Sequence, residues 1–146
     1  MKRQVIYLDV RVDTEETLEQ VATRVGQALD CTFTEVEQPK NRYPYVAEVF
    51  GLKLRLLGVR GIDGKKVSKL VGHVSESGFR SPGKGLSEHD QVDVSAYIVD
   101  LLTMRTGLQW YQPTVEDRAA ENKWSAAYDD WLGGVEDLRR LRDLYD

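Results

Sequence analysis

The alternation of apolar and charged residues in Leu52-Lys53-Leu54-Arg55-Leu56 constrains the fold more than any other feature of this sequence. Side chains along a β-strand point to opposite faces in turn, so the three leucines share one face and the two cations share the other. A strand of this kind belongs in an antiparallel sheet with one face on a core and one face in water. The sequence therefore predicts an amphipathic sheet whose apolar face is covered by helices.

Other strand patterns lie on both sides of this segment. Alternation or an excess of β-forming residues marks each of them, and Gly61-Ile62-Asp63-Gly64 is typical of a hairpin connection. Their order along the chain favours an antiparallel meander with a short last strand. The expected strands cover residues 5–12, 31–37, 45–50, 52–56, 67–75 and 108–112.

Helical spacing of apolar residues occupies most of the remaining chain. Asp13, with Glu16 three residues later, is the expected N-cap of a first helix that ends near Asp30. A loop is expected over residues 77–91, and a second helix should run from about Asp93 to a C-terminal cap at Gly107. The apolar face predicted for the second helix consists of Val94, Tyr97, Ile98, Leu101 and Leu102.

A third helix is expected from a capping box at Thr114 and Asp117 to about Leu132, and a fourth over residues 135–145. The chain has 146 residues, which suits one domain over residues 1–146. We therefore predict one α+β domain. It should have a mainly antiparallel sheet of about five strands, helices packed on one face, and a helical C-terminal segment.

The sequence offers few groups for catalysis or metal binding. Its single cysteine, Cys31, excludes a cysteine-based zinc site, and it has only two histidines. Residues 78–85 match the start of the phosphate-binding pattern G-x-x-x-x-G-K-[ST], but Gly85 replaces the hydroxyl residue that holds magnesium. We expect no catalytic residue, metal or cofactor. The alternative is a small enzyme or nucleotide-binding domain that uses the 78–90 loop with Lys84 and His89.

The sequence shows the pattern of neither a membrane span nor a signal peptide. No apolar stretch approaches the roughly 20 residues of a membrane span. The apolar run at residues 5–8 is too short for the core of a signal peptide. These observations predict a cytoplasmic protein without a membrane partner.

Charge is distributed unevenly along the chain. The net charge is −4, but residues 40–84 carry 10 basic and 3 acidic side chains, a net charge of +7. A nucleic-acid-binding adaptor is therefore a second alternative, because clustered cations neutralise phosphates. An isoelectric point near 5.3 argues against a nucleic-acid partner. The cations of this alternative are Lys53, Arg55, Lys65 and Lys66.

The C-terminal third combines aromatic and acidic residues, which we call the acidic ridge. The tryptophans have helical spacing and would in the simplest case pack the third helix onto the sheet. The acidic residues lie between the apolar positions and must face elsewhere. Such a surface is typical of contact with a basic protein partner. The acidic ridge consists of Trp124, Asp129, Asp130, Trp131, Glu136 and Asp137.

The N-terminal half carries a family resemblance. The pattern Thr14-x-x-Thr17-Leu18-x-x-Val21-Ala22-x-x-Val25-Gly26-x-Ala28-Leu29 follows a strand, and Tyr45-Val46-Ala47-Glu48-Val49-Phe50-Gly51-Leu52-Lys53-Leu54 comes next. Over residues 4–76 the chain resembles small acidic immunity proteins of bacterial polymorphic or contact-dependent toxin systems. The resemblance implies a non-enzymatic inhibitor that covers the active site of a cognate protein toxin, for example a nuclease with a basic cleft. No binding residue is transferred from the family, and the acidic ridge is the expected contact surface.

Overall fold

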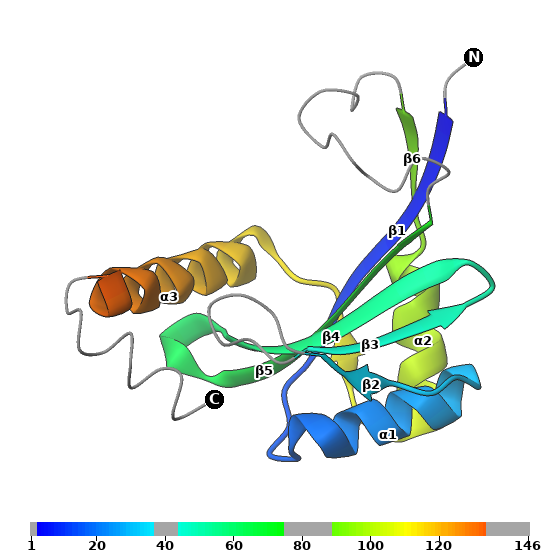
Figure 1. Ribbon diagram of the computed structural model, residues 1–146, viewed down its shortest axis with the longest axis horizontal. Coiled ribbons are helices and arrows are strands. Elements are labelled where there is room, and N and C mark those ends of the chain that lie inside the picture. Colours follow the sequence, from blue (N-terminus) through cyan, green and yellow to red (C-terminus); the bar gives the residue numbers. More distant parts are fainter. Residues whose placement is uncertain (1–2, 37–43, 75–88, 134–146) are drawn as a thin grey trace.

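A computed structural model of the chain describes residues 3–36, 44–74 and 89–133 (Figure 1). In these residues the strands are β1 (Arg3–Val12), β2 (Thr34–Glu35), β3 (Tyr45–Val49), β4 (Leu52–Arg60), β5 (Lys66–Val74), β6 (His89–Asp93) and β7 (Trp110–Tyr111). The helices are α1 (Leu18–Leu29), α2 (Ser95–Thr106) and α3 (Val115–Gly133), and the 3-10 turn η2 (Ile62–Gly64) joins β4 to β5. The predicted α+β class is confirmed.

The strands form one mostly antiparallel sheet in the order β2-β3-β4-β5-β1-β6, and β7 pairs with the end of β1. The exception is β6, which runs parallel to β1 with Arg3 opposite His89 and Tyr7 opposite Asp93. The prediction of a loop through residue 91 is therefore wrong for residues 89–91. The segment His-Asp-Gln-Val-Asp has a single apolar residue, so backbone pairing with β1 forms this strand without an apolar pattern.

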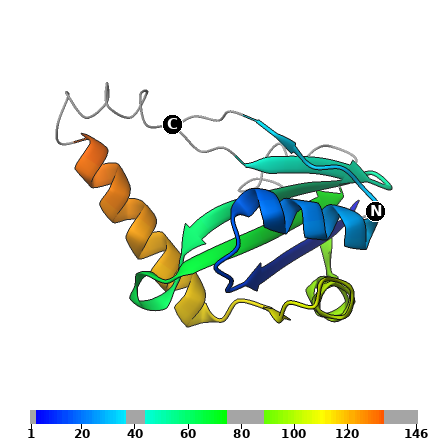
Figure 2. The same cartoon turned by 90° about the horizontal axis from the view of Figure 1, so that it is seen from below.

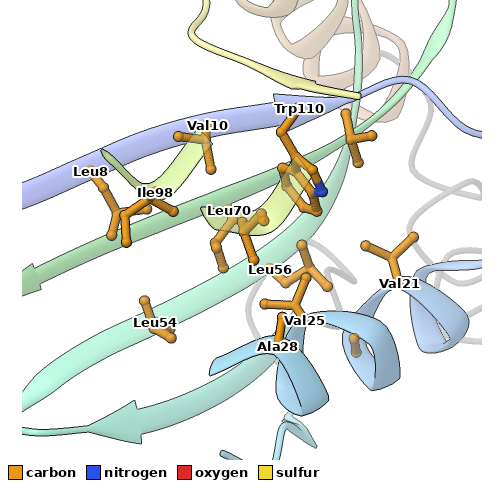
Figure 3. Close-up of a cluster of buried hydrophobic side chains, with 13 residues drawn as sticks. Leu8, Val10, Val21, Val25, Ala28, Leu54, Leu56, Leu70, Ile98 and Trp110 are labelled. Carbon is orange, nitrogen blue, oxygen red and sulfur yellow. The ribbon is translucent and has the colours of Figure 1, made fainter. Parts of the chain in front are cut away.

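The core lies between α1, α2 and one face of the sheet (Figure 3). Leu54 and Leu56 of β4 are buried there, while Lys53 and Arg55 are exposed on the other face, as the alternation predicts. Figure 3 shows Val25 of α1 facing the sheet from below. We call the opposite side of the sheet the open face. No helix of the described residues is long and apolar enough to cross a membrane.

The first helix begins one turn later than predicted. The hydroxyl of Thr17 accepts from the Gln20 N–H at 3.1 Å, and the Gln20 side chain accepts from the Thr17 N–H at 2.8 Å. Asp13 is not the N-cap. Its carboxylate instead accepts from Lys65 Nζ at 2.8 Å and from the Tyr111 hydroxyl at 2.6 Å. Both four-residue patterns suit a capping box, and distant partners of Asp13 decide between them.

The other helix boundaries follow their local signals. Asp30 ends α1 and Gly107 ends α2, both in the left-handed region as C-terminal caps. Thr114 and Asp117 form the predicted capping box, with both N–H to side-chain bonds present at 2.9 and 3.1 Å. The predicted face of α2 is wrong at Tyr97, which is 63% exposed while Ile98 is buried. Neighbouring helical residues lie about 100° apart, so these two cannot share a narrow buried stripe.

The third helix meets the open face of the sheet through charged side chains. Arg11 alternates with the core residues of β1 and therefore points to the open face, where α3 covers it. Its Nη2 atom donates to Glu121 of α3 at 2.6 Å, and Lys69 Nζ of β5 donates to the same carboxylate at 2.9 Å. Asp9 lies 3.5 Å from Arg11 Nε. The base of α3 is thus held to the sheet by a partly buried ionic cluster.

This cluster also sets the ionisation of Glu121. Burial alone would raise the pKa of its carboxyl group. The hydrogen bonds and charges of Lys69 and Arg11 outweigh burial, so the pKa of Glu121 lies below its ordinary value. The ionised carboxylate is therefore the form that stabilises the folded state.

We expect Glu121→Gln to lower the free energy of unfolding by about 3 kcal/mol, because it removes the closest anion from the buried Arg11 guanidinium. Urea unfolding followed by circular dichroism measures the change. Glu116→Gln is the matched control, since Glu116 is exposed in the first turn of the same helix. Its effect should stay below about 1 kcal/mol. Equal losses in the two variants would contradict the role assigned to Glu121.

The contribution of Glu121 should also disappear in acid. Its folded-state pKa is lowered, so its stabilisation is complete above the unfolded pKa of about 4.3 and is lost as the pH falls through the folded pKa. The difference in unfolding free energy between wild type and Glu121→Gln should therefore shrink below about pH 4. Unfolding curves recorded between neutral pH and about pH 3 test this. A difference that stays constant over that range would mean that another group carries the effect.

Candidate functional site

The end of α3 carries the part of the acidic ridge that the structure describes. Asp129, Asp130 and Trp131 lie in the last two turns of α3, where the backbone alone is described. Glu136 and Asp137 lie outside the described residues. Figure 2 shows that the C-terminal end of α3 extends away from the sheet. The first three residues are therefore placed on a helical extension beyond the body of the sheet.

Trp124 lies where this extension begins. One side of its indole contacts the η2 turn so closely that a Cβ atom on Gly64 would lie 2.8 Å from Trp124 Cζ2. Gly64 also has a φ of +75°, so both the backbone and the indole require glycine there. The indole nevertheless remains 45% exposed. Trp124 therefore packs on the β4–β5 hairpin with one side and presents the other side to solvent.

The base of α3 is fixed from two directions. The Thr114 N–H donates to Asp117 at 2.9 Å, and this bond is the main cause that lowers the pKa of the Asp117 carboxyl group. Glu121, one turn later, accepts from Arg11 and Lys69. A cap and an ionic cluster in consecutive turns orient the helix before it leaves the sheet. The exposed indole and the distal acidic residues are consequently carried on a preorganised support.

The open face holds a second candidate surface, which we call the groove. It is a hollow of about 620 Å³ over β3, β4 and β5. Lys53 and Arg55 project from β4, and His73 lies directly opposite Lys53 on β5. Glu48 stands opposite Lys53 on the other side, on β3. The groove is also lined by Thr32, Thr34, Val46, Ala47, Leu54 and Val71.

The structure separates the four cations of the nucleic-acid alternative. Lys53 belongs to the groove, whereas Lys65 Nζ donates to Asp13 at 2.8 Å and Lys66 Nζ donates to the Glu16 carbonyl at 3.1 Å. Lys66 pairs with Arg60, which lies seven residues along β4 from Lys53. At about 3.3 Å per residue this is roughly 23 Å. A common patch of all four cations is therefore not formed.

Phe50 is a feature that the sequence analysis missed. Phe50 and Gly51 form the turn between β3 and β4, and both have left-handed backbone, with φ of 52° and 76°. Turns of this kind favour asparagine or glycine at the first position. Phe50 is fully exposed, so its ring adds no packing that would offset the strain. The sequence does contain a signal for this turn, since an aromatic residue stands directly before glycine between two strand patterns.

The enzyme alternative depends on the loop over residues 78–90, with Lys84 and His89. Residues 78–88 lie outside the described residues, and the backbone places His89 and Asp90 in β6. Cys31 is partly buried against the core, and burial followed by the Asp30 charge raises the pKa of its thiol. Within the described residues, no three acidic, histidine or cysteine side chains group as metal ligands do.

Comparisons with protein-family models, with curated proteins and with solved structures give no match for this chain. Two surfaces of the described residues are the candidates for a functional site. One is the exposed indole of Trp124 at the base of the α3 extension, and the other is the groove with the neighbouring turn at Phe50.

Phe50→Asn should raise the free energy of unfolding by about 1 kcal/mol, because asparagine adopts left-handed backbone more easily than phenylalanine. Thermal or urea unfolding measures the gain. Phe50→Ala removes the same ring but keeps the left-handed penalty, so its effect should stay within about 0.5 kcal/mol. A loss of stability in both variants would show that the ring supports the fold.

Proposed function

We propose that this chain is a non-enzymatic protein inhibitor, an immunity protein that neutralises a cognate bacterial toxin in the cytoplasm of the producing cell. The observation that carries the proposal is the half-exposed Trp124, seated on the β4–β5 hairpin where α3 leaves the sheet towards Asp129 and Asp130. Aromatic anchors beside charged groups are the usual centre of a protein interface. The family resemblance over residues 4–76 supports the same assignment.

The charge of this surface favours a basic partner. A nuclease toxin, for example, needs cations in its cleft to hold phosphates, and carboxylates on a projecting helix complement such a cleft. Opposite charges speed the encounter, while the indole excludes water at the contact. Because the base of α3 is already ordered by Glu121 and Asp117, little conformational entropy is lost there on binding. Inhibition then follows from covering the active site, without any reaction on this chain.

Co-expression tests the proposal. The open reading frame next to the gene for this chain is induced in a bacterial host, alone and together with the chain. Growth arrest that is relieved by the wild-type chain, together with a stable complex of the two purified proteins, is the expected result. Growth arrest that persists despite abundant folded chain, with no complex formed, would refute inhibition of that toxin.

Reversal of Asp129 and Asp130 to lysine should slow association with the toxin by about ten-fold or more at low salt and should flatten its dependence on salt. Association rates measured by biolayer interferometry at several salt concentrations give both quantities. Reversal of Glu15 and Asp100 to lysine is the matched control. It changes the net charge equally at exposed positions outside α3 itself. Equal slowing by the two double variants would remove the α3 end from the interface.

A further inference from the structure

The groove gathers positive charge that the fold does not use. Lys53 and Arg55 are two residues apart on β4, so both project from the open face about 7 Å apart. Within the described residues, neither side chain forms a hydrogen bond or an ion pair with a carboxylate. Glu48 lies across the β3–β4 pair from Lys53 and is the acidic side chain that lines the groove. The local charge therefore remains positive.

His73 adds a polar group between these cations and β1. Burial lowers the pKa of His73, and the charges of Lys53 and Arg55 lower it further. Its imidazole is therefore neutral near pH 7 and adds no third positive charge to the groove. A negatively charged group that enters the groove meets two cations and one neutral ring.

The remaining lining suits an anion that is attached to an apolar or flat group. Val46 and Val71 flank Arg55 on the neighbouring strands and give the groove an apolar floor. Thr32 and Thr34 add hydroxyl groups at the β2 side. A volume of about 620 Å³ lies in the range of sites for small organic ligands. The groove thus combines charge, hydrogen-bonding groups and apolar surface in one hollow.

An exposed aromatic ring lies at the end of the same hairpin. Phe50 follows Glu48 by two residues, so it lies in the turn about 7 Å beyond the Glu48–Lys53 pair. Its ring is fully exposed on left-handed backbone, a combination that weakens the turn and contributes nothing to the core. Exposed aromatic side chains are the surfaces on which proteins stack nucleic-acid bases. A ligand with both a phosphate and a base would use the whole arrangement.

We infer that the groove binds nucleoside phosphates, with Lys53 and Arg55 holding phosphate oxygens and Phe50 stacking a base. A free nucleotide and a single strand of nucleic acid both offer this chemistry. The net charge of −4 does not prevent binding, because salt screens exposed charges beyond about 8–10 Å. The groove and the α3 surface are separate sites, so this inference does not depend on the proposed toxin inhibition.

Fluorescence anisotropy tests the site with two probes, labelled adenosine monophosphate and a labelled single-stranded adenine oligonucleotide of about 12 residues. Lys53→Glu/Arg55→Glu should weaken the binding of both probes by about ten-fold or more. Phe50→Asn, which is expected to stabilise the fold, should weaken it by about five-fold or more. Lys66→Glu/Lys123→Glu changes the net charge equally outside the groove and should change affinity by less than about two-fold.

The salt dependence distinguishes the two sources of the ligand. Tighter binding of the strand than of the monophosphate, with a logarithmic salt slope about 1.4 steeper for wild type than for Lys53→Glu/Arg55→Glu, identifies nucleic acid. Equal affinities for the two probes identify a free nucleotide. The inference is overturned if neither probe binds at millimolar concentration, if adenosine competes as well as its monophosphate, or if both double variants weaken binding equally. Circular dichroism confirms that each variant is folded.

Discussion

The burial of one guanidinium determines where the last described helix lies. Arg11 sits on β1, between β5 and β6, with its side chain 1% exposed, and a buried charge is stable only next to an opposite charge. Glu121 supplies that charge from 110 residues further along the chain. The helix that carries Glu121 must therefore cross the open face above Arg11. Lys69 shares the carboxylate, and Arg118 approaches Asp9 at 3.8 Å, so the helix base has several ionic contacts.

This mode of attachment explains why the helix projects. A helix that is held by an apolar stripe lies along the core for its whole length. The first turns of α3 are instead fixed by Asp117, Glu121 and the indole of Trp124 on the hairpin turn, and the later turns extend beyond the sheet (Figure 2). Polar anchoring at one end thus produces the geometry that the proposed interface needs. The same groups that stabilise the fold also position Trp124.

Local patterns predicted the parts of the fold that depend on neighbours in sequence. The alternation over residues 52–56, the cap at Gly107 and the Thr114–Asp117 box all involve residues a few positions apart, and all are confirmed. Errors arose where distant partners decide. Asp13 binds Tyr111, 98 residues away, so the helix begins at the next capping box. In Val10-Arg11-Val12 the alternation alone predicts that the arginine faces solvent. In the structure α3 covers this arginine and buries it.

The acidic ridge was easier to predict from the sequence than the groove, for a related reason. Acidic residues beside tryptophans stand out by composition, whereas the groove requires the strand register that places His73 beside Lys53. Solvation alone accounts for cations on an open sheet face, since charge also protects strands from aggregation. Solvation does not account for Phe50. Its exposed aromatic side chain lowers solubility, and its left-handed backbone weakens the turn. An exposed ring that opposes both effects, beside cations that form no ion pair within the described residues, is the strongest reason to regard the groove as a binding site.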